Sequence, residues 1–391
     1  MSGRHPRNSS RVRKIGYIAA GTLLLVAVTA MAALSGSGDD LVVISWSELG
    51  MYSPGSNFST LCIHPPFSTL KAQVVKRGTG IDKPSLVNSD VSLTYEIPNN
   101  SWSFGKTNFW DYTSTLFGFE LFPDMGLTGN GLTGQFRLAP SKDHFLADGI
   151  PVTPYTDYDT MSETPYQTAQ VNLADSDGNT VSSTEPVIPV SNEMNCYACH
   201  GSEQNMLAVH PKVPYFDPSQ PVLCISCHAS NMFRAKGVPQ AKSLSEQIHR
   251  THDKYTNNCY ACHPGTETRS LRGTMATRTG MTCQDCHGNM ANVSDSIARG
   301  RRPWLDEPSC GKCHGPQYSE EPGKLFRNSK GHGGLYCSAC HGSPHAILPS
   351  REGADNQQNT ALQGFEGTLQ NCNVCHEQVP FGSGPHQVSA K

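Results

Sequence analysis

One pattern, Cys-x-x-Cys-His, recurs seven times in the second half of the 391-residue chain. The copies are Cys196-Cys199-His200, Cys224-Cys227-His228, Cys259-Cys262-His263, Cys283-Cys286-His287, Cys310-Cys313-His314, Cys337-Cys340-His341 and Cys372-Cys375-His376. Two intervening residues place both thiols on one side of a tight helical turn, and the next residue directs its imidazole from the same turn. This is the attachment signature of c-type haem, in which the thiols become thioethers and the histidine binds the iron.

Other uses of paired cysteines fit the pattern less well. Zinc ribbons contain Cys-x-x-Cys pairs but need no histidine directly after each second cysteine. A disulfide framework needs no histidines either, and a thioredoxin-like motif would occur once, on a βαβ pattern that is absent here. The sequence therefore predicts seven covalently bound haem c groups, each with its iron.

A second supply of histidines lies in the same half, outside the motifs. These candidate distal iron ligands are His210, His249, His252, His332, His345 and His386. Histidine on both faces of an iron gives a six-coordinate centre that exchanges electrons without binding substrate. Seven irons need seven such ligands, so one is missing from these six.

The missing ligand has several candidate sources. A methionine (Met206, Met232 or Met290) would raise the potential of that haem, and an open position would suit a reductase. His64 and His144 of the first half are the remaining candidates, from the same molecule or a neighbour. We favour His64, because Pro65 and Pro66 stiffen its loop and could hold the imidazole outward.

The N-terminus predicts export from the cytoplasm. Five basic residues precede the apolar run 15–34, and Ala30-Met31-Ala32 is typical of a signal-peptide cleavage site. Residues 1–34 are therefore expected to be a signal peptide or, if uncleaved, an N-terminal membrane anchor. The protein would then act at the cell surface, outside the cell or in the periplasm.

The charge is uneven along the rest of the chain. Residues 33–190 hold 7 basic and 17 acidic residues, a net charge of −10, whereas residues 191–391 hold 18 and 16, a net charge of +2. This contrast predicts a domain boundary near residue 190. With no basic excess to neutralise phosphates, nucleic-acid binding is not expected.

Residues 35–190 read as a β-rich domain without haem. Short apolar or alternating runs at 41–46, 70–76, 90–97 and 168–174 are separated by turn-rich segments. Asp175-Ser176-Asp177 opens like a calcium loop, but a hairpin turn between 168–174 and 180–190 fits better. Cys62 is expected to be a buried, unreactive thiol, with an intermolecular disulfide as the alternative.

Residues 191–391 allow fewer than 30 residues for each of the seven haems. The haems themselves must then supply the core and pack against one another. The expected fold class is mixed: a β-rich N-terminal domain, followed by a multihaem cytochrome domain of sparse short helices and loops wrapped around packed haems. Arg299, Arg301 and Arg302 are candidate partners for haem propionates, with a solvated surface as the alternative.

This half resembles the multihaem c-type cytochromes of metal-reducing bacteria, found at the outer surface and in the periplasm. The resemblance is carried by the motif array and by GHGGLYCSACHGSPHAILPS (331–350) and DNQQNTALQGFEGTLQNCNVCH (355–376). In the first half, SELGMYS followed by PPFSTLKAQVV is similar to a haem-free module that precedes some of these arrays. That family usually has a histidine and a cysteine where Tyr52 and Ser53 stand here.

These features predict an electron carrier rather than an enzyme. Expected partners are other cytochromes or redox proteins and an extracellular electron acceptor, and head-to-tail self-association would give a filament. The alternative is a multihaem reductase of a nitrogen or sulfur oxyanion, which needs one iron with an open position. All seven motifs are standard, which argues against the reductase.

Overall fold

The computed structural model describes residues 40–80, 82–192, 196–213, 216–265, 267–382 and 384–387. The predicted leader, 1–34, lies outside the described residues. Contacts join Ser37–Lys391 into one compact unit. No helix among the described residues is long and apolar enough to cross a membrane.

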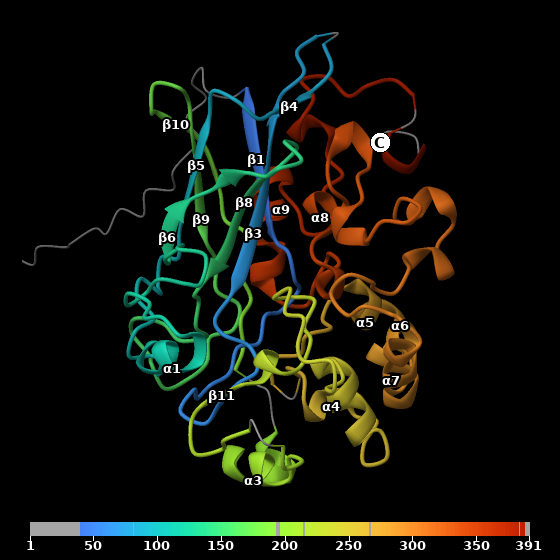
Figure 1. Cartoon of the computed structure of the whole chain (residues 1–391). Coiled ribbons are helices and arrows are strands. Elements are labelled where there is room, and N and C mark those ends of the chain that lie inside the picture. Colours follow the sequence, from blue (N-terminus) through green and yellow to red (C-terminus); the bar gives the residue numbers. More distant parts are fainter. Residues whose placement is uncertain are drawn as a thin grey trace, which may run out of the picture. The chain divides into compact units, whose positions relative to one another are not determined.

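Two antiparallel sheets dominate the described part of the chain before residue 190 (Figure 1). The first sheet orders β1 (Leu41–Ser47), β3 (Ser68–Lys76), β8 (Phe145–Ile150) and β7 (Arg137–Leu138), with β4 (Ser85–Val87) paired to β3. The second orders β10 (Thr180–Thr184), β9 (Gln170–Ala174), β5 (Ser92–Glu96) and β6 (Thr133–Gln135). The strands expected at 41–46, 70–76, 90–97 and 168–174 are thus confirmed as β1, β3, β5 and β9.

The two sheets share one apolar core. Val43 and Leu70 of the first sheet cluster with Leu93, Val171 and Leu173 of the second, and each of these side chains is almost completely buried. β5 alternates exposed and buried residues because only one of its faces meets this core. The β-rich expectation is therefore correct, and the sheets pack face to face as a sandwich.

β1 differs from β5 because both of its faces are covered. Val43 points into the sandwich core, while Val42, Ile44 and Trp46 pack in a second cluster with Tyr336 and with residues of the last two motifs. For this reason β1 is buried at every position from Val42 to Ser47, including the polar Ser45. The cysteine-rich half thus covers the outer face of the first sheet.

The hairpin expected after residue 174 is present as β9 and β10, paired antiparallel. The Asp175 carboxylate accepts hydrogen bonds from the backbone N–H groups of Asp177 and Asn179, at 3.0 and 2.9 Å. The carboxylate therefore closes a turn, as the hairpin interpretation requires.

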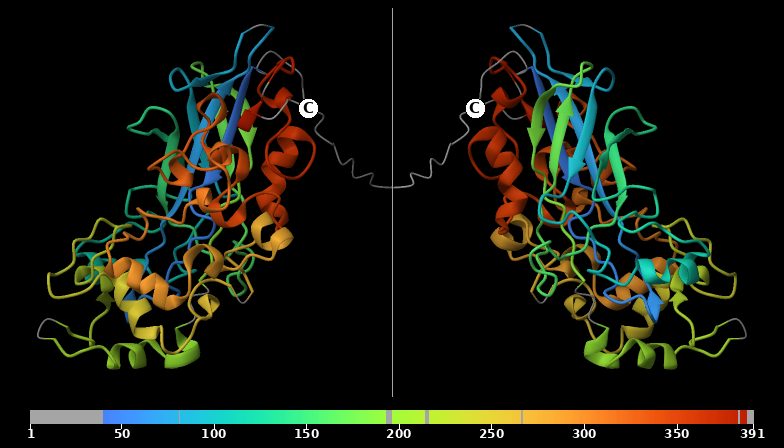
Figure 2. Two further views of the ribbon diagram at one scale, coloured as in Figure 1. Left: turned by 90° about the vertical axis from the view of Figure 1, so that its right-hand side faces the viewer. Right: turned by 90° about the vertical axis from the view of Figure 1, so that its left-hand side faces the viewer.

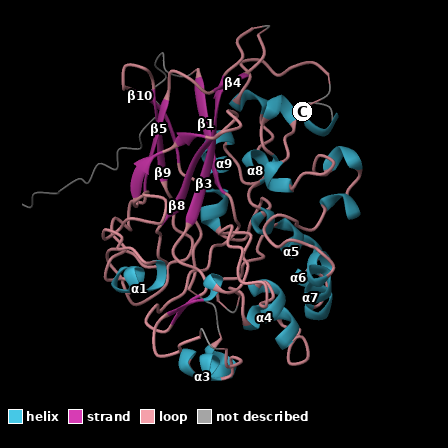
Figure 3. Ribbon diagram, viewed as in Figure 1, coloured by secondary structure: helices cyan, strands magenta, loops and turns pink. Residues whose placement is uncertain are grey.

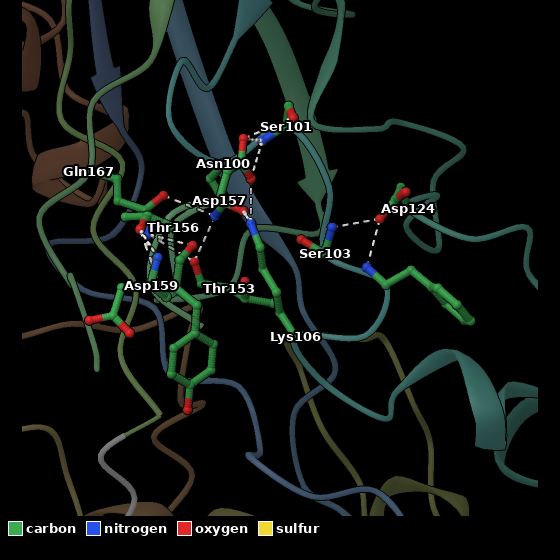
Figure 4. A network of polar contacts seen from close by, with 12 residues as sticks. Asn100, Ser101, Ser103, Lys106, Asp124, Thr153, Thr156, Asp157, Asp159 and Gln167 are labelled. Carbon is green, nitrogen blue, oxygen red and sulfur yellow. Dashed lines mark hydrogen bonds and ion pairs between the residues drawn. The ribbon is translucent and has the colours of Figure 1, made fainter. Parts of the chain in front are cut away.

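A buried polar network stiffens the long connections between strands (Figure 4). The Lys106 ammonium, with a completely buried side chain, donates to Asn100 Oδ1 at 2.7 Å and to Asp157 Oδ1 at 2.6 Å. The same Asp157 carboxylate accepts from the Ser101 backbone N–H. These bonds fasten the 99–106 loop to the 153–159 loop. The short elements η1 (Trp110–Tyr112) and α1 (Thr113–Phe117) follow the first loop.

Beyond residue 195 the elements are short helices and single helical turns (Figure 3). The α-helices are α2 (Tyr197–His200), α3 (Glu203–Ala208), α4 (Leu244–His252), α5 (Thr274–Thr279), α6 (Cys283–His287), α7 (Met290–Ala298), α8 (Cys337–His341) and α9 (Gly353–Gln363). The 3₁₀ turns are η2 (Cys224–Ser226), η3 (Cys259–Ala261), η4 (Cys310–Lys312), η5 (Pro316–Tyr318), η6 (Phe326–Asn328), η7 (His332–Gly334), η8 (Pro344–Ala346), η9 (Cys372–Val374) and η10 (Pro385–Gln387). The longest helix, α9, has only 11 residues, so the expectation of sparse short helices is correct.

A small parallel pair links the two halves. β2 (Leu61–Cys62) pairs with β11 (Val222–Leu223), which ends one residue before Cys224. Cys62 is completely buried, and burial raises the pKa of its thiol well above the ordinary value. The structure therefore supports the buried-thiol interpretation of Cys62.

Candidate metal centres

Each motif folds as one helical turn. The backbone N–H of the motif histidine bonds to the carbonyl of the first cysteine four residues earlier, for example His263 to Cys259 at 2.9 Å and His376 to Cys372 at 2.8 Å. Asn258, Ser309 and Asn371 cap the turns of the third, fifth and seventh motifs through their side chains. In α6 and α8 the turn ends at a glycine with positive φ, Gly288 or Gly342. The helical turn predicted for the motif is confirmed.

The structure brings six of the seven motif histidines opposite a second histidine. The pairs and their ring-centre distances are His200–His252 at 6.1 Å, His228–His210 at 6.2 Å, His263–His249 at 6.1 Å, His287–His345 at 6.2 Å, His376–His332 at 6.0 Å and His341–His386 at 5.8 Å. All six spare histidines of this half are used, each once.

These separations fit a metal ion held between two imidazoles. An imidazole nitrogen binds a first-row transition metal at about 2.0 Å, so two rings on opposite sides of one ion have centres roughly 6 Å apart. Imidazoles in van der Waals contact would lie closer. No group of three or more metal-binding side chains occurs among the described residues. Two protein ligands per ion suit haem, whose ring supplies the other four.

Backbone carbonyls orient several of these rings. The Nδ1 atoms of His249, His252 and His210 lie 2.7, 2.7 and 2.9 Å from the carbonyl oxygens of Ser245, Ile248 and Pro211. A carbonyl can only accept, so each Nδ1 carries the proton and each Nε2 keeps its lone pair for a metal. His228 and His386 are held in the same way, by Lys242 and Gln317 at 2.7 and 2.6 Å.

α4 supplies two of the opposing histidines. It begins at the Ser243 cap, whose side chain accepts from the Glu246 N–H, and it packs against α7. His249 and His252 are three residues apart and so lie on neighbouring positions of one face. His249 faces the third motif and His252 faces the first, so α4 fixes the positions of two centres relative to each other.

Thiols of successive motifs lie close enough to influence one another. Burial, and then the neighbouring Cys196, raise the pKa of Cys224 to about 12. Burial, and then the neighbouring Cys262, likewise raise the pKa of Cys196. Burial and Cys313 do the same for Cys286. The pKa of Cys259 falls to about 7 because Cys283 donates a hydrogen bond to it. These effects indicate that thiols of motif 1 lie near those of motifs 2 and 3, that motif 4 lies near motifs 3 and 5, and, through Cys340 and Cys375, that motif 6 lies near motif 7.

The fifth motif is different. His314 is exposed, and no histidine among the described residues lies in ring contact with it. Because the six spare histidines are all paired elsewhere, the shortfall counted from the sequence falls on this motif.

His64 and His144, the two candidates from the first half, occupy unlike surroundings. The His64 ring is partly buried beside Tyr52, Phe233 and Trp304, and burial lowers its pKa to about 4. Its Nδ1 lies 3.3 Å from the Ser53 carbonyl, as in the paired histidines. The ring therefore lies against aromatic side chains, where the sequence had led us to expect an outward-facing imidazole.

His144 is buried and bonded to protein groups. Its Nδ1 lies 2.7 Å from the Asp143 carboxylate and 3.3 Å from the Tyr336 hydroxyl. This ring faces a carboxylate and a phenol in place of a second histidine.

Of the basic cluster, Arg302 forms a two-bond ion pair with Asp306. Arg301 bonds to Ser296 and lies near enough to His249 and His287 to lower the pKa of both. Arg301 is therefore the member of the cluster closest to the proposed metal centres.

The comparison with known families agrees with this geometry. Residues 292–342 match the family described as cytochrome c554 and c-prime, and this stretch contains the fifth and sixth motifs together with His332. No curated protein and no solved structure matches the chain. The family match, the motif turns and the histidine pairs support a c-type cytochrome that binds haem c and transfers electrons.

Proposed function

We propose that this chain carries seven covalent haem c groups and relays electrons between them outside the cytoplasm. The observation that carries the proposal is the set of six histidine pairs, all at 5.8–6.2 Å and each containing one motif histidine. Each bound haem supplies a one-electron iron couple.

The chain's own residues would attach, orient and insulate these groups. The fourteen motif thiols would hold the haems covalently, and the two imidazoles of each pair would be the protein ligands of six irons. Carbonyls such as those of Ser245 and Ile248 fix the Nδ1 proton and so keep each Nε2 directed at the iron. Six-coordinate iron leaves no position for substrate, which suits electron relay.

The contacts between motifs support a route for the electrons. Motifs 2, 1, 3, 4 and 5 adjoin in that order, and motifs 6 and 7 adjoin each other. Glu320, which accepts from the Cys310 N–H at 3.0 Å, also affects the pKa of Cys337 and so lies between motifs 5 and 6. We propose that electrons pass between centres whose motifs adjoin.

The fifth iron would be completed from outside the chain. Of the described histidines outside the six pairs, His144 is bonded to Asp143 and Tyr336, which leaves His314 and His64. The His64 Nδ1 already lies 3.3 Å from the Ser53 carbonyl. In our proposal His64 of one copy serves His314 of the next. A head-to-tail contact that repeats without closing gives a filament, which would make polymerisation part of the electron path.

The second candidate function is a reductase of a nitrogen or sulfur oxyanion. It is favoured by the same exposed His314, because an iron with one protein ligand could bind a small anion. In the relay, partners are other cytochromes, redox proteins and an extracellular acceptor. In the reductase, His314 marks the reaction centre.

Intact-protein mass spectrometry after expression with haem-maturation enzymes tests the haem count. The relay requires a mass increase of seven haems, and a smaller increase in fully matured protein contradicts it. His64→Ala separates the two candidates: loss of filaments together with a new high-spin iron supports the relay. Unchanged assembly and spectrum in this variant contradict the role of His64.

A further inference from the structure

A buried ion pair lies close to the fourth centre. Arg272 is completely buried, and its guanidinium forms two bonds to the Asp355 carboxylate, Nε to Oδ2 and Nη2 to Oδ1, both at 2.7 Å. Nη1 donates to the carbonyls of Gly50 at 2.6 Å and Ser270 at 3.1 Å. Desolvating such a pair is costly, and apolar residues of similar volume often serve stability equally well. This pair therefore calls for a role beyond stability.

The backbone around Arg272 holds the loop that carries His345. The N–H groups of Arg272 and Gly273 both donate to the His345 carbonyl, at 2.9 and 3.1 Å, and Thr274 donates to the Ile347 carbonyl at 2.8 Å. The Arg351 N–H returns a bond to the Arg272 carbonyl at 3.2 Å. The 345–351 segment is thus fastened at both ends to the residues around Arg272, and its His345 faces His287 of the fourth motif.

Two glycines show how closely these segments approach. A Cβ added at Gly50 would lie 2.9 Å from the His345 Cβ, and one added at Gly273 would lie 2.4 Å from the Ile347 nitrogen. The side chain of Arg272 bonds to the Gly50 carbonyl, and its backbone N–H bonds to the His345 carbonyl. The loop that carries His345 is therefore held between Gly50 and the backbone around Arg272.

Asp355 connects Arg272 to the sheet through α9, a short polar helix with many buried side chains. Gln358 Oε1 accepts from the Ser45 N–H of β1 at 2.9 Å and from the Thr184 hydroxyl of β10 at 2.8 Å. Asn359 Nδ2 donates to the Cys340 carbonyl of the sixth motif at 3.2 Å. Figure 2 shows α9, in red, beside the strands in both views. α9 therefore bonds to the sheet, to the sixth motif and to Arg272, and it fixes their positions relative to one another.

We propose that Arg272, fixed by Asp355, is a positioning residue for His345 as the axial ligand of the fourth haem. The inference rests on the proposed function, because it requires a haem between His287 and His345. The buried guanidinium of Arg272 is held beside the His345 backbone by these bonds, so the pair sets both the place and the electrostatic surroundings of this ligand.

The experiment compares variants of the whole, haem-loaded protein by low-spin and high-spin absorption and by redox titration. His345→Ala provides the reference spectrum for loss of this one ligand. The double variant Arg272→Met with Asp355→Leu removes the pair without leaving a buried charge. It should convert one iron toward the His345→Ala spectrum or shift its potential, and Arg272→Lys should restore most of the wild-type signal.

The single variant Asp355→Asn should shift the haem potential in a direction that a merely structural role would not predict. It leaves the positive charge of Arg272 without its counter-charge, so the potential of this one haem should rise. The matched control is Arg137→Gln in the sandwich, which breaks a two-bond pair with Asp148 whose arginine side chain is 53% exposed, and it should change nothing.

The inference is overturned if the double variant keeps the wild-type spectrum and potentials, or if the altered iron is not the one altered by His345→Ala. If the double variant does not accumulate, Arg272→Lys and Asp355→Asn decide, and wild-type spectra and potentials in both overturn it. A haem count below seven would instead contradict the proposed function.

Discussion

The β-sandwich and the motif-bearing half stabilise themselves in different ways. The sandwich has one continuous apolar core that draws side chains from both sheets, such as Leu70, Leu93 and Leu173. Among the described residues after 195, the buried apolar side chains are only Leu207, Ile297, Tyr336, Ala339, Ala346, Leu348 and Val374. A segment of this length cannot hold a fold on so little apolar burial. In our proposal the second half therefore depends on its haems for a core, whereas the sandwich supplies its own.

Blocking haem attachment should give the largest effect. Expression without maturation enzymes should leave residues after 195 unfolded, because their core is missing, while the sandwich keeps its strands. Limited proteolysis and circular dichroism measure this: we expect a β-type spectrum and a protected fragment that ends near residue 190. If the whole apo chain is equally protected from proteolysis, the two halves do not differ in their dependence on haem.

Core truncations should lower the unfolding free energy by different amounts in the two halves. This difference should be smaller than the effect of blocking haem attachment. Leu173→Ala, at a completely buried position, should cost about 2–5 kcal/mol of unfolding free energy. Leu207→Ala in the second half should cost clearly less, since covalent haems constrain that region. Denaturant titration of both variants in the haem-loaded protein provides the measurement, and equal losses would argue for a conventional core in each half.

Gln358 tests the junction between the halves. Gln358→Ala leaves the Ser45 N–H and the Thr184 hydroxyl without their acceptor, which should cost about 1–3 kcal/mol. Gln357→Ala, at the neighbouring exposed position of α9, is the control and should cost little, because it removes only a solvent-exposed bond to Glu185. If the two variants unfold at the same temperature, α9 does not hold the halves together through Gln358.

The sequence predicted the local features well. The strands β1, β3, β5 and β9 and the motif turns depend on nearby residues, and all were found where expected. It also predicted that one distal ligand would be missing. The consecutive apolar residues 41–44 of β1 were a readable sign of burial on both faces, but the prediction did not use them.

The missed features depend on contacts far apart in the chain. Nothing near His345 indicates His287 as its partner, because that pairing is made by loops that only the fold brings together. Asp355 and Gln358 belong to a polar segment that looks solvent-exposed, yet each finds a buried partner more than 80 residues away. No local pattern marks Arg272 as the partner of α9.

The pH dependence of the sandwich should be the smallest effect. Burial, only partly offset by Asp143 and Glu48 and reinforced by Lys71, lowers the pKa of His144 below its ordinary 6.5. The unfolded chain then binds this proton more readily than the folded one. Stability should therefore be complete above pH 6.5 and decline as the pH falls below it. Thermal unfolding between pH 7.5 and 5 should show a flatter slope for His144→Asn, and an identical slope would exclude this contribution.

The axial ligands of the irons test the central claim most directly. Near-infrared magnetic circular dichroism of the oxidised monomer distinguishes two-histidine iron from histidine–methionine and high-spin iron. The account predicts six two-histidine centres and one centre of another kind, that of His314. A monomer with fewer than six two-histidine centres would contradict the histidine pairing on which the account rests.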